Sequence, residues 1–142
     1  MLMAENVLIR TENLCKYFRV SGGRVLRAVD DVNLFIRRGE TLGLVGESGC
    51  GKSTLGRTMI GIYKPTKGKL VYDGQELDLH KKESRFAYAK KAQIVFQDPY
   101  ASLDPRMTVA SIIEEGMVIH NLYDQAGRRE RVAELLDIDL KN

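Results

Sequence analysis

The 142-residue sequence predicts an α/β fold, in which a mixed β-sheet is combined with an antiparallel β part. Three observations lead to this class. The first third reads as strands separated by turn signals, a short apolar run ends in a glycine-rich loop that opens a helical pattern, and the last third contains two more helical patterns. The apolar fraction of 44% and the charged fraction of 29% are typical of a globular chain and argue against a disordered or fibrous class.

The N-terminal part is expected to form strands. Residues 6–10 and 13–20 are rich in Val, Ile, Leu and aromatic side chains, and residues 21–23 (SGG) are a turn signal. Residues 28–36 (AVDDVNLFI) alternate apolar and polar side chains, as a half-buried strand does. Residues 41–45 (TLGLV) form the short apolar run of a fully buried strand.

Helices and strands are expected to alternate after this point. In order, we expect a helix over residues 51–62, a strand over 69–72, a helix over 81–91, a buried strand over 92–96 (AQIVF), a helix from Thr108 to about His120 and a helix over 127–136. Thr108 has the side chain of a helix N-cap. Asp98-Pro99 and Asp104-Pro105 bracket an irregular stretch, because a residue before proline avoids the helical region.

Charge and composition exclude several classes of function. The net charge is 22 − 19 = +3, and the basic pairs are scattered, so nucleic acid is not expected as a partner. No apolar run approaches the ~18 residues of a membrane span. Glu5 and Asn6 interrupt the apolar core that a secretory signal needs. Cys15 and Cys50 are too few for a disulfide framework, which fits a reducing cytosol.

Residues 46–53 (GESGCGKS) fit the pattern G-x-x-x-x-G-K-[ST], between a buried-strand candidate and a helical pattern. This pattern is typical of a loop that binds the phosphates of a nucleoside triphosphate. Backbone N–H groups at a helix N-terminus bind a dense anion well, and glycines let that backbone approach the ligand closely. The residues that we expect to bind the nucleotide are Gly46, Glu47, Ser48, Gly49, Cys50, Gly51, Lys52, Ser53 and Thr54.

Three side chains of this loop have chemistry of their own. Lys52 supplies a point charge for the β- and γ-phosphates, and the Ser53 hydroxyl can complete the ligand shell of Mg²⁺. Cys50 stands at a helix start, where a thiolate is favoured, so we expect it to be alkylated readily and protected by Mg-ATP. The alternative for Cys50 is an inert small residue.

Four stretches resemble the ATP-binding cassette (ABC) family: residues 11–18 (TENLCKYF), 28–36 (AVDDVNLFI), 40–54 (ETLGLVGESGCGKST) and 97–109 (QDPYASLDPRMTV). The resemblance is strongest to the ATPase subunits of bacterial oligopeptide and dipeptide importers, and it covers residues 6 to about 137. It implies the core of a P-loop NTPase. The implied division is residues 1–40 as an antiparallel β part, 41–97 as the phosphate-loop core and 98–142 as the start of a helical subdomain.

The resemblance also assigns roles to two residues outside the loop. Tyr17 matches the aromatic residue that stacks on adenine; alternatively, Tyr17 or Phe18 packs in the sheet, and only one of these neighbours can face the base. Gln97 matches the glutamine that reaches both Mg²⁺ and the attacking water. The implied catalytic residues are therefore Lys52 and Gln97, and the implied metal ligands are Ser53 and Gln97.

The function implied by the resemblance is that of an ATP-binding subunit. Such a subunit couples Mg-ATP binding and hydrolysis to peptide uptake through separate membrane permease subunits. It pairs with a second ATPase subunit and works indirectly with an extracytoplasmic substrate-binding protein. Residues 98 to about 115 would face the permease, and Tyr100, Met107 and Val109 either lie on that surface or pack locally. The implied location is cytoplasmic, peripheral on the inner face of the cell membrane.

Three parts of the family pattern are missing from the sequence: an LSGGQ-type signature, an apolar strand that ends in Asp-Glu, and a later His. We therefore expect the N-terminal part of a longer subunit, which binds nucleotide weakly and does not turn over ATP. Without an Asp-Glu strand beside it, the segment 41–45 would expose an apolar edge. Two alternatives stay open: an ABC ATPase outside peptide transport, as in phosphonate metabolism, and a non-hydrolytic nucleotide-binding fragment.

Overall fold

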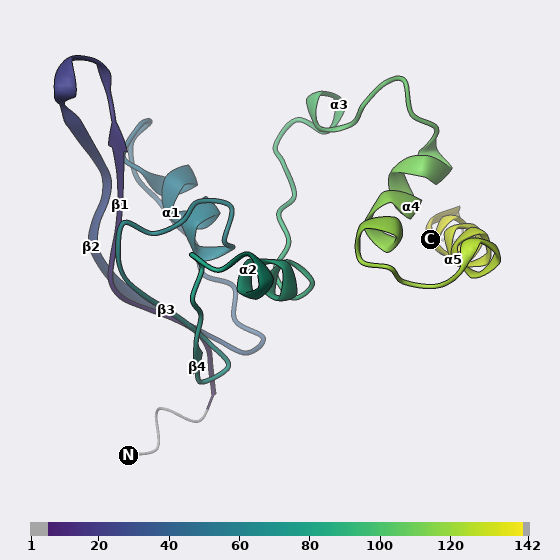
Figure 1. The fold of residues 1–142 in the computed structure, drawn as a ribbon, viewed down its shortest axis with the longest axis horizontal. Coiled ribbons are helices and arrows are strands. Elements are labelled where there is room, and N and C mark those ends of the chain that lie inside the picture. The colour runs from purple at the N-terminus through teal and green to yellow at the C-terminus, as the bar shows by residue number, and fades with distance from the viewer. Residues whose placement is uncertain (1–5, 141–142) are drawn as a thin grey trace. The chain divides into compact units, whose positions relative to one another are not determined.

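The computed structural model describes residues 6–140, and the chain divides into two compact units, Met1–Ile94 and Val95–Asn142. The first unit holds a four-stranded antiparallel sheet in the order β2-β1-β3-β4 (Figure 1). Its elements are β1 (Val7–Arg19), β2 (Val25–Arg37), α1 (Lys52–Met59), β3 (Lys67–Tyr72), β4 (Gln75–Glu76) and α2 (Lys82–Ala89). The second unit holds α3 (Pro99–Ser102), α4 (Val109–Ile119) and α5 (Gln125–Leu140). The predicted α/β class is confirmed.

The strands β1 and β2 form one long hairpin, closed by a 3₁₀ turn at Ser21–Gly23. The sequence suggested a break between two strands near residue 12, whereas the structure has one strand with an irregularity there. Asn13 adopts a left-handed conformation with φ of 49°, which asparagine tolerates better than most residues. Its N–H donates to Asn33 Oδ1 at 2.7 Å and its side-chain amide donates to Asp31 Oδ1 at 2.7 Å, so the bulge is held by side chains of β2.

Helix α1 packs on the β1–β2 part of the sheet. Leu14 and Val29 from the strands and Leu55 and Met59 from the helix form one buried cluster. Leu55 and Met59 are four residues apart and therefore lie on the same face of the helix. This packing fixes α1, and hence the loop that precedes it, against the sheet.

A second cluster joins α2 to β3 through Leu70, Leu79 and Tyr88. The buried Tyr88 hydroxyl donates to the carbonyl oxygen of Met59 at 3.0 Å, at the end of α1. Burial raises the pKa of Tyr88 to about 12, so this hydroxyl keeps its proton at neutral pH. The two helices of the first unit are thus connected by a buried hydrogen bond.

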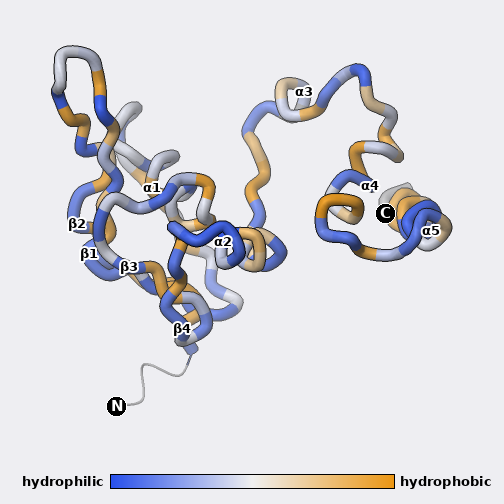
Figure 2. Tube along the Cα trace, in the orientation of Figure 1, coloured by the Kyte–Doolittle hydropathy of each residue, from blue (hydrophilic) through white to orange (hydrophobic). Residues whose placement is uncertain are grey.

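The two buried strands predicted at residues 41–45 and 92–96 are wrong, because neither segment is a strand. A strand needs a neighbour that pairs with its N–H and C=O groups, and within residues 6–140 the sheet contains only β1 to β4. The expected exposure of the first segment is found: Leu44 and Val45 are 44% and 98% exposed. The second segment is equally open, with Val95 97% exposed, and its hydrophobic character is visible between α2 and α3 (Figure 2).

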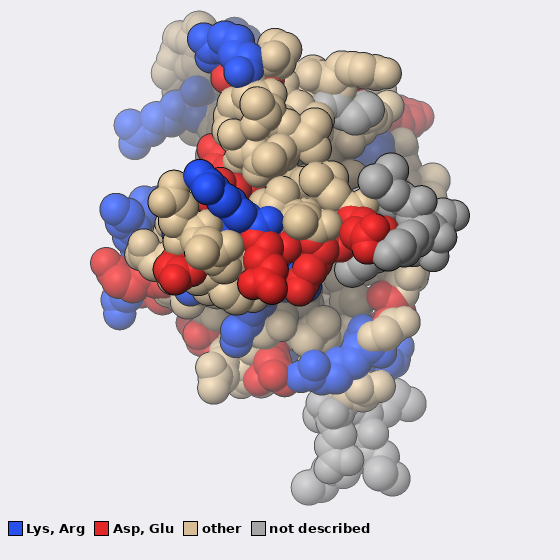
Figure 3. All heavy atoms as spheres, turned by 90° about the vertical axis from the view of Figure 1, so that its right-hand side faces the viewer, with Lys and Arg blue, Asp and Glu red and all other residues tan. Residues whose placement is uncertain are grey.

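The two helices predicted near the C-terminus are confirmed as α4 and α5. Arg128 of α5 joins them, since its Nε donates to Glu114 Oε1 of α4 at 2.8 Å and its guanidinium also donates to the Tyr123 carbonyl oxygen at 3.1 Å. Several apolar side chains of this unit remain exposed, among them Val109, Val118, Ile119, Leu122 and Tyr123. In Figure 3, acidic side chains gather near the middle of the face shown, with a broad uncharged area above them and basic side chains beside and below them.

Thr108 caps α4 as predicted, because its side chain accepts a hydrogen bond from the Ser111 N–H at 3.2 Å. Thr108→Ala is expected to destabilise α4 by about 1 kcal/mol, since an N-terminal N–H of the helix loses its acceptor. Hydrogen exchange at the first-turn amides of α4 measures this loss as faster exchange. Thr108→Ser keeps the hydroxyl and serves as the control. Equal protection in the alanine and serine variants would contradict the assignment of the cap.

None of the helices within residues 6–140 has the length and apolar character that a membrane span requires.

Candidate functional site

The glycine-rich loop of residues 46–51 leads directly into the N-terminus of α1. The helix begins at Lys52, and Gly51 occupies the N-cap position with φ of 98°. No side chain caps this end of the helix. The first-turn N–H groups have no carbonyl partner within the helix, so they are available to an anion at the loop.

Two glycines of the loop lie where a Cβ atom would be crowded, and one of them, Gly51, also has a positive φ of 98°. A Cβ atom on Gly51 would lie 2.2 Å from the Ala28 carbonyl oxygen, which is backbone of β2 and cannot move aside easily. A Cβ atom on Gly46 would lie 2.8 Å from Cys50 Sγ. The loop therefore depends on glycine where it meets the backbone of β2, whereas the space beside Gly46 is taken by the Cys50 side chain.

The Lys52 ammonium bridges the loop. Its Nζ atom donates to the carbonyl oxygens of Gly46 and Glu47, both at 2.7 Å, and lies 3.5 Å from Cys50 Sγ. Cys50 is exposed. The positive charge is thus held over the open face of the loop, within reach of an anion that contacts the N-terminus of α1.

A hollow of about 540 Å³ adjoins this loop. One wall consists of residues 48–54 of the loop and of α1. The other wall comes from the far end of the β1–β2 hairpin, where Phe18, Leu26, Arg27 and Ala28 line the hollow. A wall that contains one aromatic ring, that of Phe18, and a loop of backbone donors therefore face the same space.

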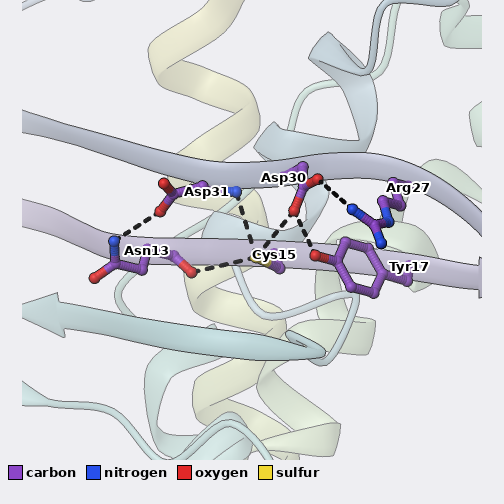
Figure 4. A network of polar contacts seen from close by, with 6 residues as sticks. All are labelled: Asn13, Cys15, Tyr17, Arg27, Asp30 and Asp31. Atoms are coloured by element: carbon purple, nitrogen blue, oxygen red, sulfur yellow. Dashed lines mark hydrogen bonds and ion pairs between the residues drawn. The ribbon is translucent and has the colours of Figure 1, made fainter.

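Of the two aromatic neighbours on β1, it is Phe18 that lines this hollow; Tyr17 is not among its lining residues. The Tyr17 hydroxyl instead donates to the Asp30 carboxylate, and the Arg27 guanidinium lies 5.6 Å from the centre of the Tyr17 ring (Figure 4). Arg27 also pairs with Asp30 at 3.4 Å. The geometry therefore favours Phe18 over Tyr17 for a contact with a base.

Hydrogen bonding shifts the pKa values of Tyr17 and Asp30 in opposite directions. The bond from Tyr17 lowers the pKa of the Asp30 carboxyl, with Cys15 and Arg27 contributing further. The same bond is the largest cause that raises the pKa of the Tyr17 hydroxyl. Cys15 is buried, and its thiol contacts the Asn13 carbonyl oxygen at 3.4 Å and Asp30 Oδ1 at 3.6 Å. The contacts between Cys15 or Tyr17 of β1 and Asp30 of β2 join the two strands, as Figure 4 shows.

The other predicted site residue, Gln97, lies in the second unit, in an exposed irregular segment before α3. Asp98 follows it and caps α3, accepting hydrogen bonds from the N–H groups of Tyr100 at 2.9 Å and Ala101 at 3.1 Å. The loop residues belong to the first unit, so the role of Gln97 at a nucleotide stays a prediction. In the part of the chain that the structure describes, no three His, Cys, Asp or Glu side chains gather as metal ligands.

Sequence reasoning did not single out Arg27, Asp30 or Tyr63. Tyr63 follows α1 and packs against Phe18 with ring centres 5.5 Å apart. No local pattern in the sequence marks these residues, because each acquires its place through contacts between segments that are distant in the chain.

Comparisons with known proteins agree on one family. The family model described as ABC transporter matches residues 29–141. The oligopeptide transport ATP-binding proteins OppF and AppF of Bacillus subtilis are 48% and 46% identical to this chain over 134 and 139 residues, covering 92% and 93% of it. The dipeptide transport ATP-binding protein DppF of Escherichia coli is 42% identical over 134 residues, covering 91% of this chain. The chain spans 43%, 42% and 40% of the lengths of OppF, AppF and DppF.

Solved structures support the same fold. The dimeric bacterial ABC transporter cassette MJ0796 superimposes with a TM-score of 0.73 at 26% identity, covering 92% of this chain and 56% of that one. A second structure of MJ0796, described as a post-hydrolysis state bound to ADP and Pi, gives the same TM-score of 0.73 at 25% identity and the same coverage.

Proposed function

The chain belongs to the ABC transporter family, and from this premise we propose that it binds Mg-ATP as part of the ATP-binding subunit of a peptide importer. The observation that carries the proposal is the hollow between the phosphate loop and Phe18. Its two walls suit the two ends of one ligand, because backbone donors and an ammonium suit a triphosphate and an aromatic ring suits a purine.

The phosphate end of the ligand would lie over Gly51 and the first turn of α1. There the uncapped helix N-terminus offers N–H groups, and the partial positive charge of the helix favours an anion. Lys52 would exchange its bonds to the loop carbonyls for stronger bonds to phosphate oxygens. The remaining residues proposed for this cradle are Gly46, Glu47, Ser48, Gly49, Cys50, Ser53 and Thr54.

The base would stack on Phe18. This assignment replaces the expectation for Tyr17, whose hydroxyl is bound to Asp30. Base–aromatic stacking contributes about 1–3 kcal/mol and depends on the ring being open on one side. Phe18 is half-buried and lines the hollow, which fits that requirement.

Two side-chain oxygen donors proposed to lie near the phosphates suit Mg²⁺. The exposed Ser53 hydroxyl in the first turn of α1 and the Gln97 side-chain amide oxygen are ligands of the kind that this hard cation accepts. When bound, Mg²⁺ would supply positive charge at the β- and γ-phosphates. Lys52 and Gln97 would then stabilise the charge and orient the attacking water during hydrolysis to ADP and phosphate.

The relatives named as oligopeptide and dipeptide transport proteins support peptide uptake as the process. We propose separate membrane permease subunits and a second ATP-binding subunit as direct partners, and an extracytoplasmic substrate-binding protein as an indirect one. The corresponding location is the cytoplasmic face of the cell membrane. Genes for permeases and a binding lipoprotein next to this one would support the assignment, whereas genes for lyase subunits would contradict it.

Titration of the folded 142-residue chain with Mg-ATP in a calorimeter tests the binding step. Saturable binding at one site is expected, and Mg-AMP is expected to bind far more weakly because it lacks the phosphates that reach the loop. Absence of saturable Mg-ATP binding would overturn the proposal.

Cys50 offers an independent reporter of the same site. Its thiol is exposed and lies 3.5 Å from Lys52 Nζ, whereas Cys15 is buried. Iodoacetamide is therefore expected to modify Cys50 first, and saturating Mg-ATP is expected to slow that reaction by covering the loop. Mass spectrometry of the peptides measures both rates. Equal rates with and without Mg-ATP would place the nucleotide elsewhere.

A further inference from the structure

A second aromatic residue supports the proposed base platform. Tyr63 lies after the end of α1, and its ring meets Phe18 edge to face, with the ring planes at 84° and the centres 5.5 Å apart. Edge-to-face pairs of this kind are a favoured aromatic geometry. Phe18 sits on β1 and Tyr63 follows α1, so the contact joins two different elements of the first unit.

Tyr63 is itself held by α1. Its N–H donates to the Arg57 carbonyl oxygen at 3.1 Å, and an Arg57 guanidinium N–H donates to the Tyr63 hydroxyl at 3.3 Å. Arg57 is in the last turn of the helix whose first residue is Lys52. The helix that presents the phosphate loop therefore also fixes the ring that abuts Phe18.

Lys16 secures this arrangement from the side of the sheet. Its ammonium donates to the Lys64 carbonyl oxygen at 2.9 Å, which ties the turn after α1 to β1. The same Nζ atom lies 5.0 Å from the centre of the Phe18 ring and 5.7 Å from that of Tyr63. Cation–π attraction to both rings adds to the hydrogen bond.

We propose that Tyr63 is a positioning residue for nucleotide binding, which fixes the plane of the Phe18 ring so that it stacks on the base. The proposal rests on the proposed function. Stacking requires near-parallel rings, and a phenylalanine on a half-exposed strand would otherwise rotate about its side-chain bonds. Tyr63 does not line the hollow, so it acts through Phe18 and not through direct contact with the ligand.

The test compares a ligand that has a base with one that has none. Mg-ATP and Mg-tripolyphosphate are titrated into the 142-residue chain and into its Tyr63→Leu variant. The variant is expected to lose about fivefold to tenfold in affinity for Mg-ATP, the lower part of the range that base stacking spans, and to keep its affinity for tripolyphosphate. Tyr63→Phe keeps the ring and is expected to restore most of the Mg-ATP affinity.

Two further variants serve as a positive and a negative control. Phe18→Leu removes the platform itself and is expected to show the same selectivity with a larger loss. Phe35→Leu removes an exposed aromatic ring of β2 that does not line the hollow and is expected to leave both affinities unchanged.

If the circular dichroism spectrum shows that Tyr63→Leu does not fold, Lys16→Met takes its place, since it keeps both rings but releases the turn from β1. The same selective loss is expected.

An equal loss for both ligands in the folded variant would show that Tyr63 only stabilises the unit, and unchanged binding of both would show that Phe18 needs no support. Either result overturns the inference and leaves the proposed function standing. Failure of the unsubstituted chain to bind Mg-ATP would instead overturn the proposed function itself.

Discussion

Replacing Lys52 with alanine is expected to weaken Mg-ATP binding by about 100-fold or more, because each charge-assisted hydrogen bond contributes about 1.5–3 kcal/mol and the ammonium can make two of them to phosphate oxygens. In the free chain the same ammonium holds the carbonyl oxygens of Gly46 and Glu47. It is therefore already in place when the ligand arrives. Calorimetric titration of the variant measures the loss.

Lys67→Ala is the matched control for Lys52→Ala. It removes the same charge from the start of β3, outside the residues that line the hollow. Its affinity for Mg-ATP is expected to stay close to that of the unsubstituted chain. Equal weakening in both variants would indicate a general effect of net charge, and unchanged affinity in Lys52→Ala would remove the ammonium from the proposed site.

Gly51→Ala is expected to lower the free energy of unfolding by about 3 kcal/mol or more and to abolish Mg-ATP binding. Two costs combine at this residue. The backbone has φ of 98°, which an alanine adopts only with strain, and the new methyl group would lie 2.2 Å from the Ala28 carbonyl oxygen. Relief of that contact requires movement of the loop away from β2. Urea unfolding followed by circular dichroism measures the stability.

Two other glycines separate these costs. Gly49 also has a positive φ, of 81°, but a Cβ atom there would meet nothing within 4 Å, so Gly49→Ala is expected to cost only about 1–2 kcal/mol of conformational strain. Gly56 lies inside α1 with open space around it, and Gly56→Ala is expected to stabilise the chain by about 0.5–1 kcal/mol. A Gly51→Ala variant as stable as Gly49→Ala would show that the contact with Ala28 is relieved easily.

The features that were predictable from the sequence are those determined by residues close to one another in the sequence. The phosphate loop, the helix after it and the Thr108 cap of α4 are determined by glycine, by helical periodicity and by a hydroxyl at one position. The segment 41–45 has the composition of a buried strand, but composition cannot supply a partner strand. Its secondary structure depends on pairing with residues that local patterns do not identify.

The choice between Tyr17 and Phe18 shows a second limit. Alternation along a strand indicates that the two rings face opposite ways, but it does not indicate which face meets the loop. The pairing of β1 with β2 shifts register between Leu14 and Lys16 and again between Lys16 and Tyr17. Each irregularity can reverse the faces, so alternation along the strand does not predict which of the two rings faces the loop.

The length of α1 has a consequence for ligand choice. The helix has eight residues and so measures about 12 Å from Lys52 to Met59. Its first turn presents the loop, and the turn beyond its end presents Tyr63 to Phe18. Through Tyr63, the length of the helix helps to set the separation between the loop and Phe18. Under the proposed function, a ligand that reaches both the loop and Phe18 gains from both contacts, so a nucleoside triphosphate is expected to bind more tightly than a monophosphate.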